Sequence, residues 1–68
     1  MRYFDYEKAG HEAGIPADTL DRLAEFFRIE EPHDQMLAEL HTLRACMAIK
    51  NGRVTIEEAL KEAQKPAA

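Results

Sequence analysis

Apolar residues recur along this chain at helical spacing, and no stretch alternates apolar and polar residues over more than a few positions. Strand-forming residues are sparse, and Val54 is the only valine. Four segments combine helical spacing with residues that begin or end a helix: about 6–13, 17–29, 33–50 and 56–64. The pattern therefore predicts an all-α fold in a single small domain, residues 1–68, whose last residues, 66–68, fray.

The first and fourth predicted helices have the clearest boundary signals. Asp5 can accept hydrogen bonds from the free N–H groups of a first turn, and Gly14 suits the left-handed conformation that ends a helix. Thr55 and Glu58 have the spacing of a capping box. Gly10 weakens the first helix by up to about 1 kcal/mol relative to alanine. That helix is therefore expected to depend on tertiary packing.

The second and third predicted helices carry apolar stripes. Pro16 suits the first turn of the second helix, whose stripe comprises Leu20, Leu23, Ala24 and Phe27. The main stripe of the third helix comprises Met36, Leu40, Leu43 and Met47. Three apolar residues lie roughly opposite that stripe, namely Ala38, Ala45 and Ile49. A helix that is apolar on more than one side is usually covered on more than one side.

The third helix is expected to end at Asn51-Gly52, where glycine takes the left-handed conformation without strain. The short link to Thr55 predicts a helical hairpin or corner between the third and fourth helices.

The segment from Ala9 to Leu23 resembles a helix-turn-helix. It has small residues on the first helix, a glycine turn, an apolar residue after the turn and two apolar anchors on the second helix. It departs from the usual pattern at Gly10, where alanine is more common. The outward face of the second helix carries three acids and one base, Asp18, Asp21, Arg22 and Glu25. Such a face repels phosphates, so the resemblance indicates a way of packing helices more than a way of reading DNA.

Composition and charge narrow the class of protein. The net charge is −4, from 13 acidic and nine basic residues, which disfavours nucleic acid or an anionic membrane as the main partner. No apolar run approaches the roughly 20 residues that span a bilayer, and the first residues lack the apolar region of a signal peptide. The single cysteine, Cys46, excludes an internal disulfide framework. These observations predict a cytoplasmic protein.

Candidate chemistry is scarce. The chain has no serine, its three glycines are isolated, and Cys46 lies on an apolar helix where a thiol is usually an unreactive core residue. We therefore expect neither an enzyme nor a bound cofactor. Pairs of Glu and His at metal-ligand spacing, Glu7 with His11 and Glu30 with His33, leave open a metal-binding bundle that also uses His41. A closed metal site would need ligands from a second chain, and a surface histidine beside an acid is more often simply solvated.

The chain has more apolar side chains than one buried stripe on each helix would contain. A chain of this size buries only about 60% of the surface that its unfolded form exposes, and small chains often complete their cores by oligomerising. We therefore expect a homodimer in which the third helices pack across a two-fold axis. The predicted contact residues, with the second copy or with another protein, are Phe26, Ile29, Met36, Leu37, Leu40, Ala45 and Ile49.

The predicted function is that of a non-catalytic helical interaction or adaptor protein, whose acidic rim influences the choice of partner. Two alternatives remain: a transcription-related helix-turn-helix module that binds DNA, and a metal-binding helical bundle.

Overall fold

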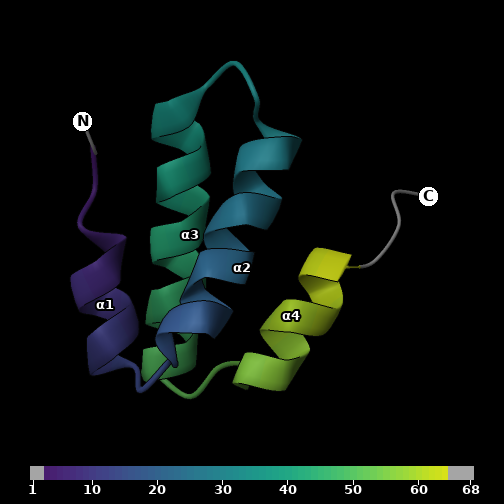
Figure 1. The fold of residues 1–68 in the computed structure, drawn as a ribbon. Helices are drawn as coiled ribbons and strands as arrows, with labels where there is room; N and C mark the ends of the chain where they lie inside the picture. Colours follow the sequence, from purple (N-terminus) through teal and green to yellow (C-terminus); the bar gives the residue numbers. More distant parts are fainter. Residues whose placement is uncertain (1–2, 65–68) are drawn as a thin grey trace.

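Residues 3–64 are described by a computed structural model, and within this range the chain forms four α-helices and no strand (Figure 1). The helices are α1 (Tyr6–Glu12), α2 (Ala17–Glu30), α3 (Gln35–Lys50) and α4 (Ile56–Gln64). The predicted all-α fold is confirmed, and each boundary lies within two residues of its predicted position. The predicted frayed tail, 66–68, lies outside the described residues.

The longest helix, α3, is the central element of the fold. Helices α1 and α2 both pack against it, and successive helices run in alternating directions (Figure 1). The short turn after α3 reverses the chain, in line with the predicted hairpin or corner, and α4 rests against α2 as well as α3. The expectation that the third helix is covered on more than one side is therefore confirmed.

Local hydrogen bonds and two glycines set the predicted boundaries. The Asp5 carboxylate accepts a hydrogen bond from the Lys8 N–H at 3.1 Å. In the capping box of α4, the N–H of Thr55 donates to the Glu58 carboxylate and the N–H of Glu58 donates to the Thr55 hydroxyl, each at 3.0 Å. Gly14 and Gly52 both have φ of +75°. These features act within a few residues of sequence, which is why they can be recognised without the fold.

The start of α3 and the position of Pro16 differ from the prediction. Helix α3 begins at Gln35, two residues later than expected, because the carboxylate of Asp34 accepts the Leu37 N–H at 3.0 Å and caps the helix. Pro16 occupies the capping position of α2 with extended backbone, φ −58° and ψ 148°, and so precedes the first turn.

The core lies where α1, α2 and the second half of α3 meet. Ile15, Leu20 and Cys46 form its buried cluster, and Leu23, one turn after Leu20 on α2, is completely buried. Five partly buried side chains pack against the cluster: Tyr6, Ala9, Ala13, Ile49 and Ile56. The two apolar anchors predicted on the second helix, Leu20 and Leu23, are therefore confirmed as buried residues.

The main apolar stripe of α3 is not the face that the chain covers. The buried residues of α3 are Ala38, Glu39, Thr42 and Cys46. By contrast, Met36 and Met47 at the two ends of the stripe remain 52% and 48% exposed. Small side chains let neighbouring helices approach closely, so α1 and α2 occupy the sides of α3 that carry them. The two methionines of the stripe are left facing outward.

Gly10 is a point of close contact between α1 and α2. It is buried, and a methyl group added to it would lie 2.7 Å from Cδ2 of Leu20, which is itself 6% exposed. The absence of a side chain at this position therefore allows Leu20 to pack directly against the backbone of α1.

Gly10→Ala is expected to lower the free energy of unfolding by about 1 kcal/mol. Overpacking typically costs about 1–3 kcal/mol, and it outweighs the helix-propensity gain of about 1 kcal/mol. Urea unfolding measures the change. In a Leu20→Ala background the same substitution is expected to stabilise the chain, because the added methyl group no longer meets Leu20. An equal loss in both backgrounds would contradict this packing explanation.

Candidate interaction surface

The outward side of α3 carries a row of four apolar side chains, which we call the α3 stripe: Met36, Leu40, Leu43 and Met47. Their spacing of three or four residues places them on one side of the helix. Met36 and Met47 are about half exposed, and the two leucines between them are partly buried. Contiguous apolar surface of this kind on a small folded chain is typical of a contact site for another macromolecule.

Charged residues flank the α3 stripe asymmetrically along the helix. The last residue of α2, Glu30, and the turn that precedes α3, with Glu31 and Asp34, carry acidic side chains. The end of α3 and the turn after it carry the bases Lys50 and Arg53. Lys50 already pairs with Glu12 at 3.3 Å, but both side chains remain about half exposed, so this pair is weak and solvent-screened. One end of the surface is therefore acidic and the other basic.

The predicted contact residues of α3 divide into two groups. Met36 and Leu40 belong to the α3 stripe. Leu37, Ala45 and Ile49 are partly buried away from it, and Ile49 packs against the core cluster. Sequence reasoning did not include two stripe residues, Leu43 and Met47, among the contacts. The signal that could have identified them was their membership of the same stripe as Met36 and Leu40.

The two predicted contact residues of α2 lie near its C-terminal end. Ile29 is 67% exposed. Phe26 is partly buried, and its ring meets the ring of Phe27 edge-on with centroids 5.3 Å apart. Both line a shallow depression whose other walls are mostly charged: Asp21, Arg22, Glu25 and Arg28. The apolar surface here is smaller and more interrupted by charge than the α3 stripe.

Glu39 is a buried carboxylate that fastens the segment before α1 to α3. One of its oxygens accepts the N–H groups of Tyr3 at 2.6 Å and Phe4 at 3.0 Å, and the other accepts the side-chain amide of Gln35 at 2.7 Å. The bonds to Tyr3 and Phe4 join positions 36 and 35 residues apart in sequence. Sequence reasoning did not single out Glu39, because a glutamate on a helix is usually exposed.

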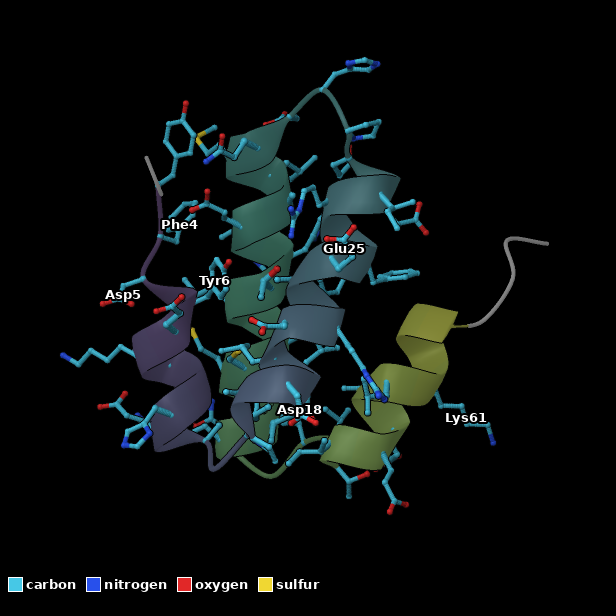
Figure 2. All side chains as sticks on the ribbon, in the orientation of Figure 1. Phe4, Asp5, Tyr6, Asp18, Glu25 and Lys61 are labelled. Carbon is cyan, nitrogen blue, oxygen red and sulfur yellow. The ribbon has the colours of Figure 1, made fainter. Side chains whose placement is uncertain are left out.

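A cavity of about 330 Å³ lies beside Glu39, between α1, α2 and α3. Figure 2 shows Tyr6 directed from α1 toward α3 on this side of the molecule. The other polar groups along the cavity are engaged within the chain. The Thr42 hydroxyl donates to the carbonyl of Ala38 at 2.9 Å, and Arg28 pairs with Glu25 at 2.8 Å. The first of these contacts lies within α3 and the second within α2, so they satisfy polar groups along the cavity without joining one helix to another.

The candidate metal ligands are dispersed over the molecule. Glu7 and His11 are exposed on α1, and His33 is exposed in the turn between α2 and α3. His41 lies against Phe27, with ring centroids 5.6 Å apart. Among the side chains that the structure describes, those of residues 3–61, no group of three or more from His, Cys, Asp or Glu is placed to hold a metal ion.

The helix-turn-helix-like segment exposes the acidic face that its sequence predicts. Asp18, Asp21, Arg22 and Glu25 are all exposed on α2, and Figure 2 shows Asp18 and Glu25 on its outward side. Carboxylates in these positions oppose the approach of a phosphate backbone.

Comparisons with known proteins add no assignment. No protein-family model matches the chain, and no curated protein or solved structure gives a significant match. In the part of the chain that the structure describes, none of the helices has the length and apolar character needed to cross a membrane. What the chain does must therefore be inferred from its own residues.

Glu39→Ala is expected to lower the free energy of unfolding by about 2 kcal/mol, because hydrogen bonds to a charged group contribute about 1.5–3 kcal/mol. The N–H groups of Tyr3 and Phe4 should also exchange with solvent faster, which NMR hydrogen exchange measures. Gln35→Ala is the matched control. It removes one side-chain donor to the same carboxylate and should leave both backbone N–H groups protected. Unchanged exchange in Glu39→Ala would show that this carboxylate does not hold the segment.

Cys46 is expected to resist thiol reagents in the folded chain. Its side chain is completely buried, and this burial raises the pKa of the thiol, with a smaller opposing effect from a backbone hydrogen bond. Burial blocks access of the reagent to the sulfur, and the raised pKa reduces the fraction of thiolate, which is the form that reacts. Both effects lower the reactivity of the thiol. A colorimetric thiol assay at mildly alkaline pH should show slow labelling of the folded chain and fast labelling in denaturant. Equal rates would contradict the packed position of Cys46.

Proposed function

We propose that this chain is a non-catalytic helical interaction protein that acts as a homo-oligomer, with the α3 stripe as its contact surface. The observation that carries the proposal is the exposure of Met36 and Met47 at the two ends of one continuous apolar row. Methionine is enriched in protein interfaces, where its flexible side chain adapts to a partner.

The small core supports the same conclusion. The largest completely buried side chains among the described residues are Leu23, Thr42 and Cys46, and only one of them is a large hydrophobic residue. A core of this kind contributes little stability for a chain of this length, and association is a common way to add apolar burial. Covering the α3 stripe would remove from water the exposed parts of four large apolar side chains at once.

A second copy of the chain is the partner that this surface favours. Homodimers with two-fold symmetry are the commonest oligomers, and their contact is made by the same patch on both copies. An apolar row on one helix, free of charged residues along its centre line, meets this requirement. The acidic face of α2 lies elsewhere on the molecule and supports no comparable contact with nucleic acid.

Sedimentation at micromolar concentration is expected to give twice the chain mass of 7.8 kDa. The double variant Met36→Lys/Met47→Lys should shift the mass to that of one chain. Both side chains are exposed, so the monomer should keep its helical circular dichroism, while burial of two ammonium groups opposes association.

Ile29→Lys is the matched control, since it places the same charge on an even more exposed apolar position of α2. It should leave the dimer intact. Loss of the dimer in this variant alone would assign the contact to α2. A wild-type mass of 7.8 kDa, with unfolding independent of concentration, would overturn the proposed function.

A further inference from the structure

We infer that two copies pair through antiparallel α3 helices, so that Met36 of one copy lies against Met47 of the other and Leu40 lies against Leu43. This inference rests on the proposed function and specifies the geometry of its contact. It follows from two features of the described residues, the order of side chains in the α3 stripe and the charges at its two ends.

The α3 stripe reads the same from both ends. Its order is Met, Leu, Leu, Met, with gaps of four, three and four residues. In a two-fold contact between antiparallel helices, the first residue of one row meets the last residue of the other, and the reverse holds on the other side of the axis. A symmetric row therefore matches side chains of equal length at every step. The axis would pass between Leu40 and Leu43.

A parallel contact would also place like side chains together, so the charges decide between the two orientations. In a parallel pair, the acids Glu30, Glu31 and Asp34 of both copies would gather at one end, and Lys50 and Arg53 of both copies at the other. In an antiparallel pair, each acidic end meets a basic end. Like charges brought together at an interface oppose association, and complementary charges fix its orientation.

The helix dipoles favour the same orientation. The N-terminal end of a helix carries a partial positive charge and the C-terminal end a partial negative charge. Antiparallel α3 helices place these opposite partial charges side by side. Glu30 and Arg53, near opposite ends of α3, are both exposed, so their charges remain available to a second copy.

Disulfide trapping distinguishes the two orientations. Two single variants, Met36→Cys and Met47→Cys, are made, and one carries a mass tag. In an antiparallel pair the two copies of position 36 are separated along the helix axis by about 16 Å, from 11 residues at about 1.5 Å each. A disulfide needs Cα atoms within about 7 Å. Neither variant should therefore link to itself under mild oxidation, whereas the mixture should give a product linked between position 36 of one copy and position 47 of the other, identified by mass.

The chain offers its own controls for this experiment. Wild type contains only the buried Cys46 and should form no linked dimer. A mixture of Ile29→Cys with Met47→Cys should also stay unlinked, because Ile29 lies on α2 outside the stripe. Circular dichroism of each variant before oxidation establishes that the helices are retained.

Each outcome gives a decision. Self-linking of Met36→Cys and of Met47→Cys, without a mixed product, would overturn the antiparallel geometry and leave the homodimer standing. A dimer by sedimentation with no linkage in any combination would overturn both this geometry and the α3 stripe as the contact. A chain that sediments as a monomer would overturn the proposed function itself, before any question of orientation.

Discussion

Close approach of helices across small side chains is the constraint on which this fold depends. Ala38, Thr42 and Cys46 line the sides of α3 that α1 and α2 cover. Gly10 allows the same close approach on α1. Leu20 packs against the backbone there, in the space that a methyl group on residue 10 would need. Packing of this kind is stabilised by many close van der Waals contacts rather than by a few large side chains. On α3 itself, the positions covered by α1 and α2 are therefore held mainly by small side chains, and the methionines lie outside them.

The packing of α1 and α2 against these small side chains determines which residues α3 presents to solvent. A short helix with an apolar stripe ordinarily turns the stripe inward, and here α3 turns its methionines outward because the inner positions are already filled. The carboxylate of Glu39 reinforces the arrangement by tying the chain before α1 to the side of α3. The features that make the bundle narrow are thus the same features that leave the α3 stripe uncovered.

The boundaries of the helices could be predicted because their causes are local. Asp5, Gly14 and the Thr55–Glu58 box each act within three or four residues, so the sequence shows both partners at once. The inward face of α3 could not be predicted, since the helix is apolar on two sides and the choice depends on which neighbours fit. The role of Glu39 was equally inaccessible, because the backbone groups that it binds, those of Tyr3 and Phe4, lie at the far end of the chain. Half of the α3 stripe, Met36 and Leu40, was nevertheless among the predicted contacts.

Folding and association are coupled in a molecule built this way. Anything that binds the folded state and not the unfolded chain stabilises it by mass action, so burial of the α3 stripe by a second copy would add to a core that is small on its own. The coupling also runs from the core to the surface. A side chain that forces α1 or α2 away from α3 would change how far Leu40 and Leu43 are covered, and with them the shape of the contact. The small residues on the covered side of α3 and the large residues of the α3 stripe therefore act on one equilibrium, because both determine how much of α3 remains in water.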